Sequence, residues 1–229
     1  MEPGETDRSR PFTFLLGFIL VLILLNIFLP SSEAKSILFD GLILAVLIAG
    51  ARAVSRKRSY FVALSTLTIL VLLLTVAKHV SPGPLVLGVR AVCLAFLLFY
   101  VAAHVFKRVL MDRKVTTDMI MGAICAYLLT GMWWSFFYGV AAVVQLGSFS
   151  VSEPLTAQGL TSIQEQASIL LYFSFVTLTT LGFGDITPLT SAARSLCWLE
   201  AVVGQMFIAI LVARLVGLHI LSASMDRDG

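Results

Sequence analysis

Six long apolar stretches divide this chain, and they constrain its fold more than any other feature does. They cover approximately residues 12–30, 36–54, 60–77, 85–106, 119–145 and 193–221. A helix needs about 20 mostly apolar residues to cross the hydrocarbon core of a bilayer, so each stretch is long enough to do so. We therefore predict an all-α polytopic membrane protein with six transmembrane helices.

The composition fits a chain whose main solvent is lipid. Of the 229 residues, 59% are hydrophobic and 13% are charged, whereas soluble domains carry about 25% charged residues. The net charge is +3, and the basic residues form short clusters between apolar stretches rather than a stripe along one face. This pattern excludes a nucleic-acid-binding surface. The three cysteines are spaced neither as a zinc site nor as a redox pair.

The basic clusters alternate along the chain and predict its orientation. They follow the second and fourth stretches, at Arg52, Arg56, Lys57 and Arg58 and at Lys107, Arg108, Arg113 and Lys114. The other short loops contain only Lys35 and Lys78. Under the positive-inside rule, both termini lie in the cytoplasm, and the loops after stretches one, three and five lie outside. We expect a multi-pass protein of the plasma membrane.

A seventh apolar stretch, residues 163–178, is too short to cross a bilayer. Ser162 and Glu165 form a capping box, which predicts a short helix that ends near Leu178 or Thr179. Backbone that leaves a helix inside a membrane must line water or be buried in protein, so this helix should be re-entrant. Entering from outside, it would direct its carbonyl end, with about half a negative charge, at the middle of the membrane, where a cation is stabilised.

The next five residues, Thr180–Gly184, form a T-L-G-F-G segment that is followed by Asp185. Gly182 and Gly184 can adopt backbone angles that are closed to other residues, as is needed if successive carbonyl groups are to point at one axis. Such oxygens can replace the hydration shell of a dehydrated cation. The segment therefore predicts an ion-binding site made of backbone.

The segment resembles the pore signature of potassium channels, which is usually T-V-G-Y-G-D or T-I-G-F-G-D. In that family an outer helix and a pore helix precede the signature, and an inner helix follows it. The resemblance covers about residues 118–220. It implies a potassium channel subunit and not an enzyme, with K⁺ bound by the carbonyl oxygens of Thr180, Leu181, Gly182 and Phe183 and by the Thr180 hydroxyl. One segment per chain implies a homotetramer. No cofactor beyond K⁺ is expected.

Two residues depart from the usual signature. Leu181 stands where valine or isoleucine is usual, and Phe183 lacks the hydroxyl of the commoner tyrosine. By the same resemblance, Tyr172 should hydrogen-bond Asp185 just outside the filter. Glu200, inside the sixth stretch, is an ionisable group in a costly place, and we expect it to form a hydrogen bond behind the pore loop.

The sixth stretch would be the inner helix that lines the pore. Gly204 stands where such helices often carry a hinge glycine, although glycine also permits close packing. If Gln205 faces the cavity, helical spacing brings Ile208, Val212 and Val216 to the same face. This apolar lining could act as a gate by dewetting.

The chain divides into a cytoplasmic N-terminus (1–11), a four-helix peripheral transmembrane domain (12–117), a pore domain (118–221) and a short cytoplasmic C-terminus (222–229). Voltage sensing needs several gating charges, because one charge moved through 100 mV yields only about 2.3 kcal/mol. The fourth stretch offers only Arg90, so we expect weak or no voltage dependence. Arg90 either pairs with Asp40 or extends to the outer headgroups.

Other functions remain to be weighed. A membrane enzyme would need clustered polar groups at catalytic spacing, whereas those of this chain are scattered singly. A sensor or scaffold protein with a vestigial pore is a second alternative. A non-selective or sodium-permeable cation channel is the third. The complete T-L-G-F-G segment favours potassium, while the stimulus that opens the pore, the direction of flux and any accessory subunits stay open.

Overall fold

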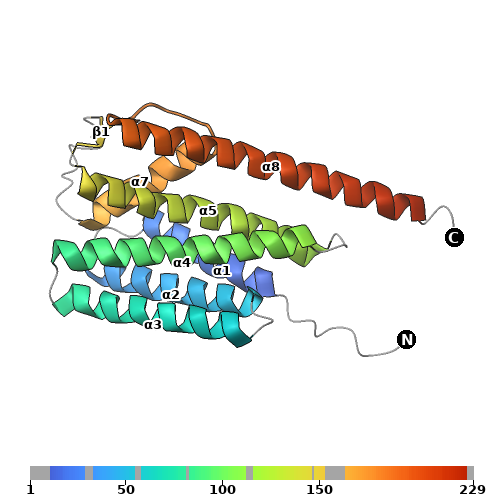
Figure 1. Cartoon of the computed structure of the whole chain (residues 1–229), viewed down its shortest axis with the longest axis horizontal. Coiled ribbons are helices and arrows are strands. Elements are labelled where there is room, and N and C mark those ends of the chain that lie inside the picture. Colours follow the sequence, from blue (N-terminus) through green and yellow to red (C-terminus); the bar gives the residue numbers. More distant parts are fainter. Residues whose placement is uncertain are drawn as a thin grey trace.

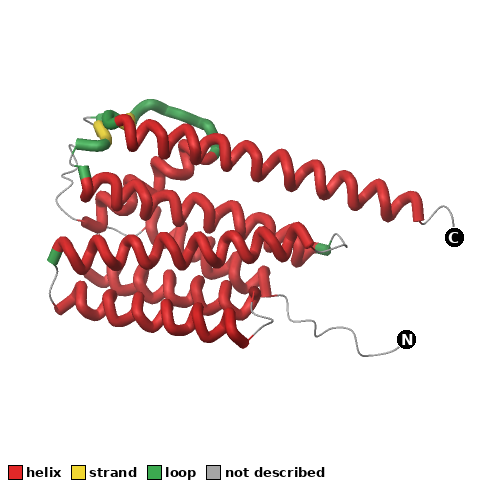
Figure 2. Tube along the Cα trace, viewed as in Figure 1, coloured by secondary structure: helices red, strands yellow, loops and turns green. Residues whose placement is uncertain are grey.

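The computed structural model of this protein describes residues 11–28, 33–54, 58–80, 83–111, 116–145, 147–152 and 163–225. The helices run side by side, and the last helix extends beyond the rest (Figure 1). Figure 2 shows one extended non-helical stretch beside the first turns of that last helix. The helices and strands are α1 (Pro11–Phe28), α2 (Glu33–Val54), α3 (Arg58–Val80), α4 (Pro84–Met111), α5 (Thr117–Val144), β1 (Phe149–Val151), α7 (Ile163–Leu178), β2 (Ile186–Pro188) and α8 (Ser191–Met225).

Local sequence explains where several helices begin. Both α1 and α4 start at a proline, whose fixed φ suits the first helical position and whose missing N–H is not needed there. Helix α5 starts after Thr116, whose hydroxyl accepts a hydrogen bond from the N–H of Met119 at 3.2 Å. Ser162, half of the capping box expected before α7, lies outside the described residues, as do several residues of the basic clusters.

Three helical segments in the described part of the chain are long and apolar enough to cross a membrane. They are Leu85–Met111, Thr117–Val144 and Ser191–Leu218. The first three helices contain shorter apolar segments, Pro11–Asn26, Ile37–Gly50 and Thr66–Lys78. The protein is therefore a helical membrane protein, and length and composition support three of the six predicted transmembrane helices.

One apolar core joins the first helices to α5. Leu15, Ile19 and Leu22 lie on one face of α1 at helical spacing and are fully buried, together with residues of α2, α4 and α5. Only residues 112–116 lie between α4 and α5, so α4 turns back along the α5 of its own chain (Figure 1). The bundle of α1–α4 is thus attached to the outer side of α5.

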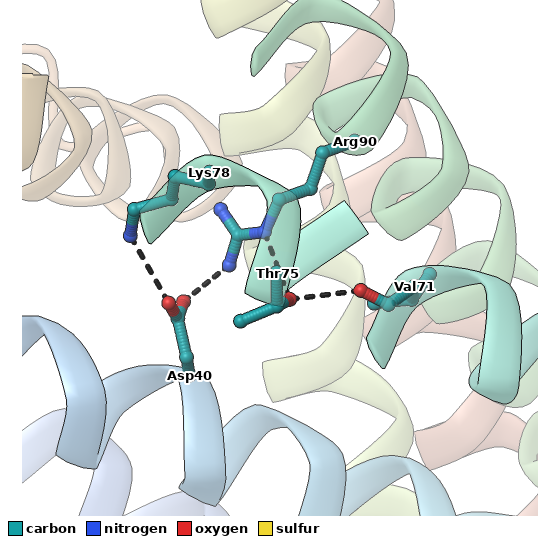
Figure 3. A network of polar contacts seen from close by, with 5 residues as sticks. All are labelled: Asp40, Val71, Thr75, Lys78 and Arg90. Carbon is teal, nitrogen blue, oxygen red and sulfur yellow. Dashed lines mark hydrogen bonds and ion pairs between the residues drawn. The ribbon is translucent and has the colours of Figure 1, made fainter. Parts of the chain in front are cut away.

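A polar network links three helices of this bundle (Figure 3). The buried carboxylate of Asp40 in α2 pairs with Lys78 of α3 at 3.0 Å and with the guanidinium of Arg90 of α4. Arg90 Nε also donates to the hydroxyl of Thr75 at 3.1 Å, and that hydroxyl donates to the carbonyl of Val71 at 2.8 Å. The pairing of Arg90 with Asp40 that the sequence left open is present.

In the described part of the chain, a short ribbon of two strands departs from the all-α prediction. Strands β1 and β2 are antiparallel, with Ser150 opposite Thr187. Each strand has three residues, too few for an alternating pattern to be recognised in the sequence. The ribbon continues into backbone hydrogen bonds from Ser152 N–H to the Asp185 carbonyl at 2.9 Å and from Leu189 N–H to the Ser148 carbonyl at 2.8 Å. It therefore ties the end of the T-L-G-F-G segment to the connection after α5.

Candidate functional site

The C-terminal end of α7 lies directly against α8. Leu178, the last residue of α7, is fully buried, and its carbonyl group touches the backbone of α8 at Gly204. A Cβ at residue 204 would collide with the carbonyl oxygen of Leu178 and would lie 3.0 Å from its carbonyl carbon. Helix α8 is unbroken from Ser191 to Met225. Of the two interpretations of Gly204, this arrangement favours close packing over a hinge.

The backbone of the T-L-G-F-G segment alternates in sign of φ. Thr180, Gly182 and Gly184 have φ of +58°, +58° and +79°, whereas Leu181 and Phe183 between them have negative φ. In an ordinary extended chain successive carbonyl groups point to opposite sides, but a chain whose φ alternates in sign can turn them toward one side. The left-handed conformation of Thr180 is rare for a β-branched residue, and strained backbone of this kind clusters at functional sites.

The N–H groups at the start of the segment point back into the last turn of α7. Thr180 N–H donates to the Thr177 carbonyl at 2.9 Å, and Leu181 N–H donates to the Val176 carbonyl at 2.9 Å. Within the described part of the chain, the carbonyl oxygens of Thr180 to Phe183 accept no hydrogen bond. A cation binds by accepting lone pairs from oxygen atoms, so these carbonyl oxygens are available to a cation.

The beginning of the segment contacts α8 through side chains. The amide of Gln205 donates to the hydroxyl oxygen of Thr180 at 3.2 Å, and the Thr180 hydroxyl donates to the carbonyl of Thr179 at 2.7 Å. Gln205 thus faces the segment, as its expected position in the cavity requires. Ile208, Val212 and Val216 follow on α8 and are between 44% and 53% exposed in the single chain.

The far end of the segment is held through Asp185. The hydroxyl of Tyr172 on α7 donates to Asp185 Oδ2 at 2.7 Å, so the predicted hydrogen bond between these residues is present. Asp185 Oδ1 accepts the N–H of Ile186 at 3.0 Å, at the start of β2. The carboxylate therefore joins α7 to the ribbon.

A buried acid lies behind the segment. Glu200 of α8 is fully buried, and its carboxyl group contacts the hydroxyls of Ser174 on α7, at 2.5 Å, and of Tyr138 on α5. The hydrogen bond expected for Glu200 is present, but the sequence interpretation missed both partners. Tyr138, Trp133 and Trp134 form an aromatic cluster that also includes Phe149 and Phe173. A buried carboxyl group requires hydrogen-bond partners. This requirement was the one sequence signal that could have led to Ser174 and Tyr138.

These features define a class: a helical membrane protein in which a short helix is packed between two long apolar helices and is followed by an exposed segment with left-handed backbone. Residues 115–218 match the family model described as "Ion channel". The match begins just before α5, includes α7, the T-L-G-F-G segment and the ribbon strand β2, and ends within α8. No curated protein matches the chain. The matched residues, which make up less than half of the chain, form an ion channel domain.

Proposed function

We propose that this chain is one subunit of a homotetrameric, potassium-selective channel. K⁺ would be bound by the carbonyl oxygens of Thr180, Leu181, Gly182 and Phe183 and by the Thr180 hydroxyl, and Gly184 would complete the filter. The observation that carries the proposal is the alternation of φ along these residues, together with N–H groups that are turned away toward α7. A column of carbonyl oxygens of this kind selects for a dehydrated monovalent cation.

What the single chain leaves uncovered supports the proposed assembly into a tetramer. The side chains of Leu181 and Phe183 are 57% and 64% exposed. In the most apolar 18 residues of each helix, only 11% are buried in α8, against 50% in α5. Apolar side chains of α8 can face lipid, but non-helical backbone at membrane depth must be covered by protein or line water. Other copies of the chain, arranged around a shared axis, would meet both requirements.

The membrane arrangement we propose has six transmembrane helices in the plasma membrane, with both termini in the cytoplasm. Consecutive helices alternate in direction, so the start of α1 and the ends of α4 and α8 lie toward the same end of the molecule (Figure 1). In this arrangement residues 12–117 form the peripheral domain and residues 118–221 form the pore domain. Tyr172, Asp185 and Glu200 support the filter, and Gln205, Ile208, Val212 and Val216 line the pore below it.

Conductance should depend weakly or not at all on voltage. Arg90, the basic residue within the apolar part of α4, is held by the carboxylate of Asp40 and the hydroxyl of Thr75. A gating charge must be free to move across the field, and four copies of one anchored arginine supply little coupling. Planar-bilayer recordings of the purified protein should give a shallow conductance–voltage curve. A steep curve would contradict this expectation.

The proposed function is tested by flux in liposomes that contain the purified protein. Under a potassium gradient the vesicles should take up tracer cation, whereas under an equal sodium gradient uptake should stay near that of empty vesicles. Equal potassium and sodium uptake would establish a non-selective or sodium-permeable channel instead. Absence of uptake for both ions, from protein that is folded and tetrameric, would favour the sensor or scaffold protein.

A further inference from the structure

Five oxygen atoms from four residues form an unbroken row behind the T-L-G-F-G segment. The Tyr138 hydroxyl contacts one carboxyl oxygen of Glu200, the other carboxyl oxygen lies 2.5 Å from the Ser174 hydroxyl, and that hydroxyl lies 2.7 Å from the carbonyl oxygen of Gly131. The row starts and ends on α5 and passes through α8 and α7. It therefore joins the three helices of the ion channel domain in a closed loop.

Gly131 allows α5 and α7 to approach closely enough for this row to form. A Cβ at Gly131 would lie 2.6 Å from the ring of Phe175. Glu200 and Ser174 are fully buried, as is Tyr138. Water therefore cannot replace a missing partner in the row, and each contact must be a hydrogen bond within the protein.

The number of protons in the row is determined by its chemistry. Two oxygen atoms at hydrogen-bonding distance need one proton between them, so three contacts need three protons. Tyr138 and Ser174 each supply one hydroxyl proton, and the Gly131 carbonyl supplies none. The third proton must lie on the carboxyl group of Glu200. The hydrogen bonds then run in one direction, from Tyr138 to Glu200, from Glu200 to Ser174 and from Ser174 to the Gly131 carbonyl.

Among the described residues, no positively charged group is paired with Glu200. The groups that face it are the Tyr138 hydroxyl and the more distant Tyr127 from α5, the Ser174 hydroxyl from α7, and Cys197 from α8 itself. A neutral acid that donates one hydrogen bond and accepts another suits this site, whereas a buried unpaired carboxylate would be costly.

We propose that Glu200 is a positioning residue that works as a neutral carboxylic acid, and that its proton closes the hydrogen-bonded loop that holds α7 behind the filter. Ser174 lies two residues before Val176, whose carbonyl accepts the N–H of Leu181 at 2.9 Å. Loss of the proton would leave the Ser174 hydroxyl to serve two acceptors, and α7 would lose its attachment to α5 or to α8. The effect on conduction rests on the proposed function, but the protonation of Glu200 does not.

The protonation is tested directly by infrared spectroscopy of the purified protein. At neutral pH the wild type should show the C=O band of a protonated carboxyl group, and Glu200→Gln should lack it. The side-chain amide of glutamine can donate to Ser174 and accept from Tyr138, so the variant should keep the fold and, within about twofold, the flux of the wild type. Identical infrared spectra for the two proteins would overturn the proposal.

A pH titration separates the positioning role from a purely structural one. The unfolded chain releases the carboxyl proton of Glu200 at about pH 4.3, whereas the folded protein keeps it to higher pH. Thermal stability should therefore fall as the pH rises from there, until the folded protein releases the proton as well. Flux should fall at the upper end of this range, where the folded protein releases the proton. Glu200→Gln, which cannot ionise, should show a flat profile for both measurements across that range. A wild-type profile as flat as that of the variant would contradict the proposal.

The chain offers a matched control for the donor of the row. Tyr138→Phe removes a hydroxyl that bonds to Glu200, whereas Tyr127→Phe removes a hydroxyl from the same helix that has no hydrogen-bond partner among the described residues. Only Tyr138→Phe should shift the infrared band and the pH range over which stability falls. Equal effects of the two variants would contradict the hydrogen-bonded row. If the wild type shows the infrared band but no potassium flux, the protonation of Glu200 stands and the proposed function is refuted. If it shows potassium flux but no infrared band, the proposed function stands and the protonation of Glu200 is refuted.

Discussion

Gly182→Ala should abolish potassium-selective flux while leaving the subunit folded. Gly182 has φ of +58°, and a Cβ built there meets no atom within 4 Å. The effect is therefore one of backbone conformation: an L-residue in the left-handed region costs roughly 1–2 kcal/mol, and a tetramer carries four copies of it. Relaxation to negative φ would turn a carbonyl group of the T-L-G-F-G segment away from the other carbonyl groups of that segment. Liposome flux should show a large fall in the ratio of potassium to sodium uptake.

Gly147→Ala is the matched control for this substitution. Gly147 also has positive φ, at +79°, with no atom within 4 Å of a built Cβ, and it lies before β1 rather than in the T-L-G-F-G segment. The two variants thus carry a similar backbone cost at different places. Gly147→Ala should retain the wild-type ratio of potassium to sodium uptake. If both variants lose selectivity equally, or if neither does, the segment is not the filter.

Gly204→Ala should destabilise the ion channel domain and remove its flux. The added methyl group would collide with the carbonyl group of Leu178, which is backbone and cannot move aside as a side chain can. Overpacking costs about 1–3 kcal/mol per site, and in this place it displaces α8 from the end of α7 that precedes Thr180. Thermal unfolding in detergent should begin at a lower temperature, and the proposed tetramers should be fewer.

Gly217→Ala provides the comparison within the same helix. Nothing lies within 4 Å of a Cβ built at Gly217, so the substitution should be neutral or stabilise α8 by up to about 1 kcal/mol, because alanine favours helices over glycine. A hinge at Gly204 makes a different prediction. In that case Gly204→Ala would keep the thermal stability of the wild type and lower only the open fraction of channels.

The ion channel domain was largely predictable because its signals are local. The short apolar stretch before Thr180 predicted a helix that ends within the membrane, and α7 ends at Leu178. The glycines of the T-L-G-F-G segment predicted left-handed backbone, and Gly182 and Gly184 have it. The left-handed Thr180 was not foreseen, because no property of an isolated threonine favours that conformation.

The contacts between helices were harder to predict. Glu200 needed a partner, but its two partners lie 26 and 62 residues away in sequence, in helices whose rotation the apolar pattern leaves undefined. An almost uniformly apolar helix shows little difference between its faces, so its neighbours are chosen by shape and by single polar groups. The ribbon between β1 and β2 escaped prediction for a similar reason, since its pairing is non-local and each strand is very short.

The sequence by itself determined that this is a helical membrane protein with an apolar helix too short to cross a bilayer, followed by a glycine-containing segment suited to a cation. Those properties follow from hydrophobic length and from the backbone freedom of glycine, which act over a few neighbouring residues. Only the tertiary structure decided that Gly204 is a packing residue against Leu178, that Asp40 anchors Arg90, and that the oxygens behind the segment need a proton on Glu200. Such facts depend on which atoms of distant helices meet, and no local pattern encodes that.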